Sequence, residues 1–242
     1  MITLHHGGAS GHSASVLIAL AEKGLDYDSR PLDLAAFEQH GAAFLRVNPA
    51  GQVPVLEADG RALIEAFFIL LYLEERFPEP PLGGAEPRAR YTVQKWGKYV
   101  ETHIAPNLAI AGWAARGVGL NAAAQQGLEL LTPERKALWR RADAGIPAED
   151  VEAARAALTK AAVRLAEDLA DCPWLAGDHF TLADIIAFPP AARLADLGID
   201  VPTGVAAWLD RVSARPAVCE ALGTGGIDRS VATMGPERGR WG

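Results

Sequence analysis

Residues 48–60 are the part of this chain that most constrains its fold. Val53-Pro54 stands at the start of a short apolar segment, and Ala58-Asp59-Gly60 follows as a tight-turn sequence. Proline donates no backbone hydrogen bond, so a strand accepts it at its first residues. We predict a cis Val53-Pro54 bond, which would turn the backbone amide and carbonyl of Val53 outward, free to pair with an extended peptide. The run therefore predicts a β-hairpin with a peptide-binding edge.

The first 77 residues alternate between short apolar segments and helical patterns, which is typical of an α/β domain. We expect strands at residues 2–4, 25–34, 53–57 and 62–64, and helices at residues 13–23, 37–47 and 65–77. The second helix should end before Asn48-Pro49, because the residue before a proline is pushed out of helical geometry. This order of elements predicts a thioredoxin-like domain over residues 1–77.

A stretch rich in proline and glycine, residues 78–87, predicts a linker to a second domain. Across residues 88–222 every strong pattern is helical, with helices expected at 88–116, 151–169, 183–196 and 205–214. Thr181 and Asp184 form a capping box, in which each side chain accepts a hydrogen bond from the backbone of the other residue. Residues 223–242 are expected to be a flexible tail. The predicted fold class is an α/β thioredoxin-like domain followed by an all-α domain.

The composition is that of a soluble globular protein. Half of the 242 residues are apolar, and the net charge is −7. No basic cluster is longer than Arg140-Arg141, so we expect no nucleic-acid partner. No apolar run is long enough to span a bilayer and no leader is visible, so we expect a cytoplasmic protein without a membrane partner. His5 and His6 are neighbours on a predicted strand and point to opposite faces, so no metal site is expected.

Three motifs in the same order give this chain a resemblance to the glutathione transferases. They are the Asn-Pro-Ala-Gly-Gln-Val-Pro run at residues 48–54, the helix that begins with Glu65, and the capping box within residues 177–184. Each motif is common alone, but the ordered set is specific to the family. The resemblance implies the fold class given above and glutathione as the co-substrate.

A narrower resemblance is to the bacterial β-aryl etherases, glutathione transferases that cleave ether-linked aromatic dimers derived from lignin. Residues 37–40, Trp96 with Lys98, and residues 139–147 carry it, together with a long insertion at residues 117–150. It implies a small aromatic ether as the second substrate. An aromatic pocket or a helical core would account for the aromatic side chains of the second domain, which are Trp96, Tyr99, His103, Trp113 and Trp139.

The resemblance also implies which residues bind glutathione. In this family the valine before the cis-proline, here Val53 before Pro54, pairs its backbone with the cysteine of glutathione. A glutamate–serine pair then binds the γ-glutamyl end, and here that pair reads Glu65-Ala66. A hydrogen bond to a charged group contributes about 1.5–3 kcal/mol, so the missing hydroxyl implies roughly 10- to 100-fold weaker binding. Ala66 is therefore the main departure from the family pattern.

The thiol of glutathione needs a hydrogen-bond donor to favour its thiolate form, since a thiol is only a few per cent ionised at neutral pH. Ser13 aligns with the serine of the etherase pattern, and His12 is a candidate for a second polar contact. A serine that caps the helix and a histidine on the surface are the alternatives. Gln39 or His40 is expected to reach the glycyl carboxylate, unless both lie on a solvated helix face.

Three functions remain open from the sequence. The first is a catalytic glutathione-dependent β-etherase, the second is a non-catalytic subunit paired with an active relative, and the third is a general detoxifying transferase. The hairpin and Ser13 favour the first, whereas Phe67-Phe68 after Ala66 would partly fill the glutamyl pocket and favour the second. The helix at residues 65–77 carries more apolar surface than one small sheet can bury. We therefore expect a homodimer, or a heterodimer with a related glutathione transferase.

Overall fold

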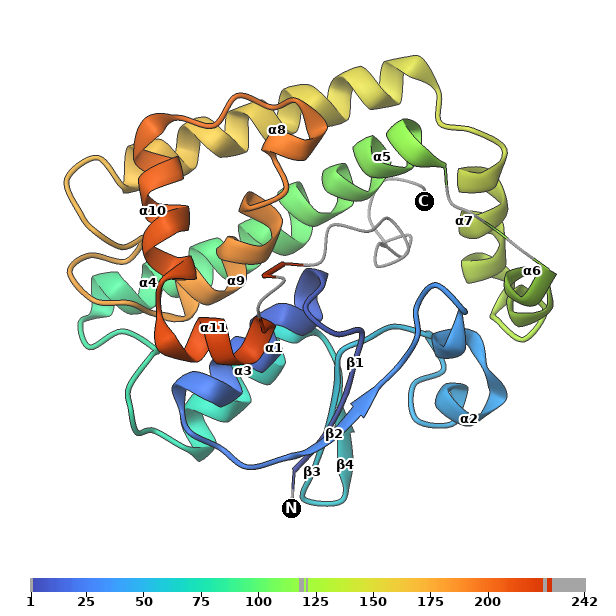
Figure 1. Ribbon diagram of the computed structural model, residues 1–242, viewed down its shortest axis with the longest axis horizontal. Coiled ribbons are helices and arrows are strands. Elements are labelled where there is room, and N and C mark those ends of the chain that lie inside the picture. Colours follow the sequence, from blue (N-terminus) through green and yellow to red (C-terminus); the bar gives the residue numbers. More distant parts are fainter. Residues whose placement is uncertain (1, 118–119, 121, 224–225, 228–242) are drawn as a thin grey trace.

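The computed structural model of the chain describes residues 2–117, 120, 122–223, 226 and 227 (Figure 1). Its N-terminal part is a mixed four-stranded sheet in the order β2-β1-β3-β4. The strands are β1 (Thr3–His6), β2 (Asp28–Pro31), β3 (Val55–Ala58) and β4 (Arg61–Leu63). β1 runs parallel to β2 and antiparallel to β3, with Leu4 opposite both Ser29 and Leu56. The expected hairpin is confirmed as β3–β4, which turns at Asp59-Gly60.

Helix α1 (Gly11–Glu22) and helix α3 (Ala66–Arg76) begin and end within two residues of their predicted bounds. The helix predicted at residues 37–47 is wrong. That stretch holds only the 3₁₀ turn η1 (Glu38–His40) and the single turn α2 (Ala42–Leu45). Phe37 has a left-handed backbone with φ of 59°, and Gly41 is extended between the two turns, so neither residue continues a helix.

The rest of the described chain is helical, as predicted (Figure 1). Its elements are α4 (Pro87–Tyr99), η2 (Val100–Ile104), α5 (Ala105–Arg116), α6 (Ala122–Leu128), α7 (Pro133–Asp143), α8 (Ala148–Asp168), α9 (Leu182–Ala191), η3 (Ala195–Leu197), α10 (Thr203–Ser213) and α11 (Pro216–Leu222). None of the helices in this part of the chain has both the length and the apolar character that crossing a membrane requires.

The helix expected at residues 88–116 is interrupted by the π-helical turn η2. Pro106, one turn later, has no backbone N–H and would crowd the carbonyl of Thr102 in a regular α-helix. The wider π turn accommodates the proline, and such turns occur often at functional sites. η2 therefore changes which side chains this helix presents to the N-terminal domain.

The predicted capping box is present at the start of α9, in the most deeply buried helix of the second domain. Both oxygens of Asp184 accept hydrogen bonds, from the amides of Leu175 and Thr181 and from Trp208 Nε1 at 2.9 Å. Burial raises the pKa of Asp184, and the hydrogen bonds that it accepts oppose that shift.

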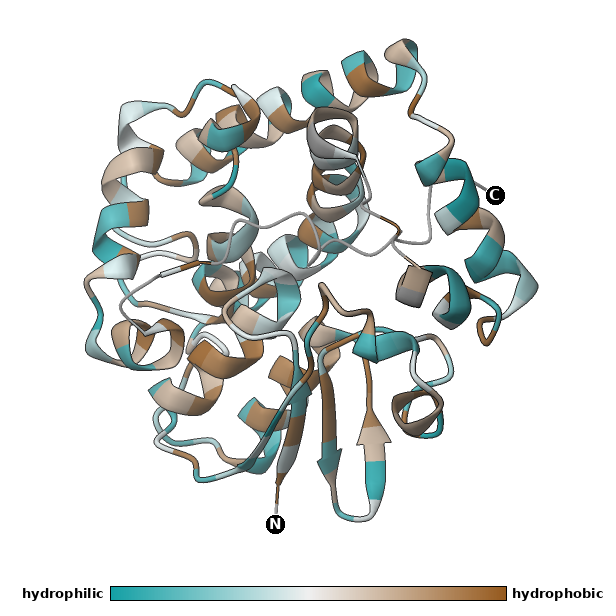
Figure 2. Ribbon diagram, turned by 45° about the vertical axis from the view of Figure 1, so that its right-hand side comes forward, coloured by the Kyte–Doolittle hydropathy of each residue, from teal (hydrophilic) through white to brown (hydrophobic). Residues whose placement is uncertain are grey.

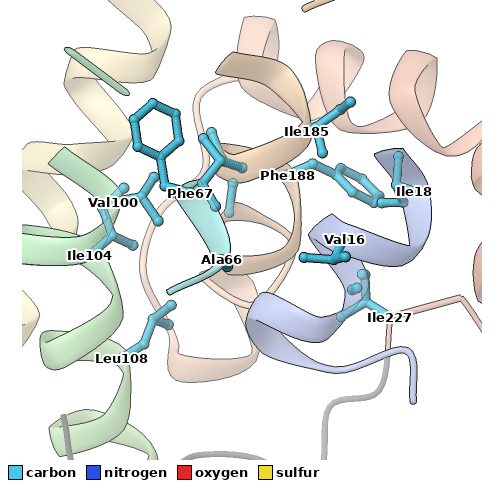
Figure 3. Close-up of a cluster of buried hydrophobic side chains, with 14 of the residues drawn as sticks. Val16, Ile18, Ala66, Phe67, Val100, Ile104, Leu108, Ile185, Phe188 and Ile227 are labelled. Atoms are coloured by element: carbon cyan, nitrogen blue, oxygen red, sulfur yellow. The ribbon is translucent and has the colours of Figure 1, made fainter. Parts of the chain in front are cut away.

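The tail predicted at residues 223–242 lies mostly outside the described residues. Ile227 is described and belongs to the same buried cluster as Val16 (Figure 3).

The insertion folds into helices α6 and α7, which lie beside α2 and η1 of the N-terminal domain (Figure 1). Helix α7 is largely hydrophilic (Figure 2), and its buried residues Arg135, Trp139 and Ala142 recur at helical spacing on one side. The ring of Trp139 meets that of the fully buried His40 edge to face at 5.4 Å. Gly127 of α6 packs so closely that a methyl group there would lie 3.0 Å from His40 Cβ.

The burial of His40 predicts a pH-dependent stability. Burial, and to a lesser extent the charge of Arg135, lower the pKa of His40 to about 4. Between about pH 6.5 and pH 4, His40 is protonated in the unfolded chain but stays neutral in the folded chain. The free energy of unfolding should therefore fall by up to roughly 1.4 kcal/mol per pH unit between about 6.5 and 4. Urea denaturation at several pH values should show a shallower fall for His40→Gln, and the exposed His179→Gln is the control. An unchanged pH dependence in His40→Gln would contradict this prediction.

Candidate active site

Two adjoining cavities lie at the N-terminus of α1, between the two domains. Ser13, Gln39 and His40 line the first cavity, and Pro54, Glu65 and Ala66 line the second, while His12 and Val53 line both. The structure therefore brings together all the residues that the sequence predicted for the site. They come from the start of α1, the η1 turn, the entrance of β3 and the start of α3.

The Val53-Pro54 peptide bond is cis, as predicted from the sequence. Pro54 is buried directly before β3, and Val53 lies at the wall that the two cavities share. Nearby, Asn48 holds the preceding loop, because its side-chain amide donates to the Gln52 carbonyl at 2.8 Å. The loop before the strand is thus fixed by its own hydrogen bonds.

Ser13 has a hydroxyl oriented by the backbone of the preceding loop. Its Oγ accepts from the amide of Gly7 at 3.0 Å. Among the described residues, no acceptor is found for its hydroxyl hydrogen, which can therefore donate to a ligand in the first cavity. Ser10, not Ser13, is at the N-cap of α1. Ser15 lies away from both cavities and donates to the Ile185 carbonyl of the helical domain at 3.1 Å.

Phe67 and Phe68 do not fill the second cavity, so the expectation that they would partly fill a glutamyl pocket was wrong. Phe67 points toward α4, where a methyl group at Gly97 would lie 2.3 Å from its ring, and Figure 3 shows it near Val100. Phe68 is 63% exposed on the outside of α3. Neither side chain lines the cavity beside Glu65 and Ala66.

Glu101 and Thr102 also line the second cavity, opposite Glu65 and Ala66, and sequence reasoning missed both. They belong to the π-helical turn η2 of the helical domain. Pro106 was the available sign of a distorted helix, but it does not show which side chains face the other domain. The cavity is therefore built from both domains.

Most of the aromatic side chains considered for a substrate pocket have structural roles. Trp96 is fully buried and donates through Nε1 to Asp168 at 2.7 Å. Tyr99 stacks on His103 with ring centroids 4.7 Å apart. Among these aromatic residues, Trp139 lines the first cavity. The ring of Trp113 packs against that of Trp139, with centroids 6.0 Å apart.

The first cavity also contains two buried arginines that the sequence did not predict. Arg135 of α7 is 1% exposed and Arg193, which follows α9, is 3% exposed. Leu34, Leu108 and the Pro189-Pro190 pair supply apolar walls. This combination of apolar surface, buried positive charge and the Ser13 hydroxyl suits an aromatic molecule next to an anionic nucleophile.

Comparisons with known proteins agree with this geometry. The glutathione S-transferase N-terminal domain family matches residues 2–75, and the corresponding C-terminal domain family matches residues 124–216. Protein LigF from Sphingobium sp. SYK-6 is 33% identical over 239 residues, which covers 90% of this chain and 92% of LigF.

Solved structures give the same result. The crystal structure of beta-etherase LigF from the same strain superimposes with a TM-score of 0.84 at 32% identity, covering 91% of this chain and 98% of LigF. Human glutathione transferase theta-2, solved in complex with glutathione and an unknown ligand, gives a TM-score of 0.71 at 25% identity, covering 91% and 86%. The chain belongs to the glutathione S-transferase family, whose co-substrate is glutathione.

Proposed function

We propose that this protein cleaves β-aryl ether bonds in lignin-derived aromatic ketones, using glutathione as the nucleophile. The observation that carries the proposal is the meeting of the two cavities at Val53 and His12, with Ser13, next to His12, lining the first cavity. The similarity to beta-etherase LigF over 90% of the chain supports this substrate class.

Glutathione would lie along the junction of the cavities. Its cysteine backbone would pair with Val53, and its γ-glutamyl end would enter the second cavity beside Glu65 and Ala66. Its glycyl end would extend toward Gln39 and His40 in the first cavity. The same arrangement would place the sulfur near Ser13, with the aromatic ketone against the apolar walls of the first cavity.

The protein would lower the pKa of the glutathione thiol in two ways. The Ser13 hydroxyl would donate to the sulfur, favouring the thiolate. The first hydrogen bond within α1 runs from the Ala14 amide to the Ser10 carbonyl, so the preceding amides of the helix have no helical partner. These amides and the helix dipole favour an anion at the opening of the first cavity.

In the reaction, the thiolate sulfur attacks the carbon next to the ketone and forms a carbon–sulfur bond. The carbon–oxygen bond of the ether breaks, and the electron pair leaves with the aryloxide. The products are a glutathione thioether and a phenol, formed when the aryloxide takes a proton from water. Holding thiolate and carbon in line is the main contribution expected of the protein.

A second candidate function is supported by one observation. Ala66 supplies no hydroxyl for the γ-glutamyl carboxylate, which favours a non-catalytic subunit that pairs with an active relative. The open second cavity weakens this alternative, because Phe67 and Phe68 lie outside it. Glutathione binding by the purified chain separates the two functions.

Replacing Ser13 tests the proposed role of its hydroxyl. Ser13→Ala should raise the pH midpoint of the bound thiolate by about one to two units, because a hydrogen bond to a charged group contributes about 1.5–3 kcal/mol. The turnover of a β-aryl ether ketone at neutral pH should fall by roughly 10- to 100-fold. The ultraviolet absorbance of the thiolate during a pH titration measures the first effect. Ser213→Ala, on the exposed end of α10, is the control. Equal midpoints for Ser13→Ala and the wild-type chain would remove Ser13 from the mechanism.

Restoring the hydroxyl at Ala66 tests the γ-glutamyl site. Ala66→Ser should tighten glutathione binding by roughly 10- to 100-fold, because the new hydroxyl can donate to the γ-glutamyl carboxylate. Isothermal titration measures this effect, with Ala62→Ser on the exposed strand β4 as the control. If neither the wild-type chain nor Ala66→Ser bound glutathione, the non-catalytic subunit would become the better function.

We propose that the chain forms a dimer through the exposed faces of α3 and α4. Most apolar residues of α3 are buried within the chain, including Phe67, Leu70 and Leu73, so its leftover apolar face is smaller than the sequence suggested. Phe68 on α3 and Tyr91 on α4 remain 63% and 67% exposed. Exposed aromatic residues of this kind commonly mark an interface.

Light scattering should therefore give twice the mass of one chain at micromolar concentration. Phe68→Asp should shift the protein toward the monomer, because the charge would have to be buried in the interface. Val163→Asp on α8 is the control, since Val163 is also exposed but lies on another helix. A wild-type monomer that associates only with a related transferase would favour the heterodimer over the homodimer.

A further inference from the structure

The loop between β1 and α1, which precedes Ser13, is held by a histidine that the proposed reaction leaves without a role. His6 is the last residue of β1 and is buried. Its Nδ1 accepts a hydrogen bond from the Gly8 amide at 3.0 Å, and its Nε2 lies 2.8 Å from the Ser29 hydroxyl of β2. Both ring nitrogens are therefore engaged, one by the loop and one by the neighbouring strand.

These hydrogen bonds assign the form of the imidazole. A backbone amide only donates, so Nδ1 carries no proton, and the proton of the neutral ring is on Nε2, facing Ser29. Burial, and to a lesser extent the charge of His5, lower the pKa of His6 below its usual value of 6.5, which favours the neutral ring. His6 is therefore an acceptor toward the loop and a donor toward β2.

Gly7 lies between His6 and Gly8, and both of its backbone polar groups contact serines at the start of α1. Its amide donates to Ser13 Oγ at 3.0 Å, and its carbonyl accepts from the Ser10 hydroxyl at 2.7 Å. A hydroxyl that already accepts a hydrogen bond is polarised and becomes a better donor. The position of Gly7 therefore decides how well Ser13 can donate to a ligand in the first cavity.

The loop is closely packed where it passes the first cavity. A methyl group added at Gly7 would lie 2.3 Å from Cδ1 of Leu34, which lines that cavity. Gly8 has a φ of 68°, a left-handed conformation that glycine adopts without strain. The hydrogen bond from its amide to His6 fixes this turn, so losing the acceptor would let Gly7 shift relative to Ser13.

We propose that His6 is a positioning residue for the glutathione thiolate. Its imidazole holds the Gly7-Gly8 turn where the Gly7 amide donates to Ser13 Oγ, so that the Ser13 proton is left for the sulfur. His6 lines neither cavity, so it acts through the loop rather than by touching glutathione or the ether. This role rests on the proposed function, because it requires a glutathione thiolate beside Ser13.

The pH midpoint of the bound thiolate, read from its ultraviolet absorbance, tests the role. His6→Phe fills similar space without an acceptor, so the midpoint should rise by roughly half to one unit, the effect of one neutral hydrogen bond. His6→Asn places its side-chain oxygen where Nδ1 lies, so its midpoint should stay within about 0.3 unit of the wild-type value. His5→Gln is the matched control, because this neighbouring histidine contacts Glu57 instead.

A double-mutant cycle shows whether His6 acts through Ser13. In a Ser13→Ala chain, adding His6→Phe should change the midpoint by less than about 0.2 unit, because the hydroxyl that His6 positions is gone. A purely structural role would give similar shifts with and without Ser13. Thermal unfolding shows which variants are folded. His6→Gln replaces His6→Phe if the latter does not fold, since its amide reaches toward Ser29 and leaves Gly8 without its acceptor.

Two results would overturn the positioning role: a wild-type midpoint in the folded His6→Phe or His6→Gln chain, and equal shifts with and without Ser13. If Ser13→Ala raised the midpoint but the His6 variants did not, the proposed function would stand without this role. If all the shifts appeared but the chain cleaved no β-aryl ether ketone, the role would stand while the proposed function failed. A wild-type chain that formed no bound thiolate would overturn both.

Discussion

Helix α1 is buried along its whole middle, from Ser13 to Leu20, and both domains are built around it. It packs against α3 of its own domain and against α9 and α11 of the helical domain. Its buried residues combine small side chains with large apolar ones, and Ser15 links the two domains directly by donating to the Ile185 carbonyl. Because the N-terminus of α1 opens onto both cavities, the packing of this one helix also fixes where Ser13 and His12 lie.

Charged groups at the other end of α1 connect this helix to the start of the linker and to the helical domain. The buried Lys23 pairs with Glu74 at 2.7 Å and donates to the carbonyls of Phe77 and Pro80 near the start of the connection between domains. Arg215 of the helical domain pairs with Glu22 at 2.6 Å. Buried ion pairs add little net stability, but losing one partner is costly, so they favour one arrangement of the domains. Cavity walls drawn from both domains depend on that arrangement.

The insertion and Ala66 lie at different cavities beside the start of α1. Ala66 lines the second cavity and supplies no hydroxyl there, while α7 contributes Arg135 and Trp139 to the first cavity and packs Trp139 against His40. Among the described lining residues, those of the insertion contribute to the first cavity and not to the second.

The sequence determined the local features: the hairpin with the cis bond at Pro54, the capping box at Asp184, and the residues at the start of α1. Turn residues, proline and capping side chains act over a few positions, so their effects can be predicted from neighbours alone. The break at Gly41, the direction of Phe67 and the burial of Arg135 depended on the tertiary structure. Packing between segments that are distant in the sequence decides which face of a short helix is buried. That face therefore cannot be predicted from neighbouring residues.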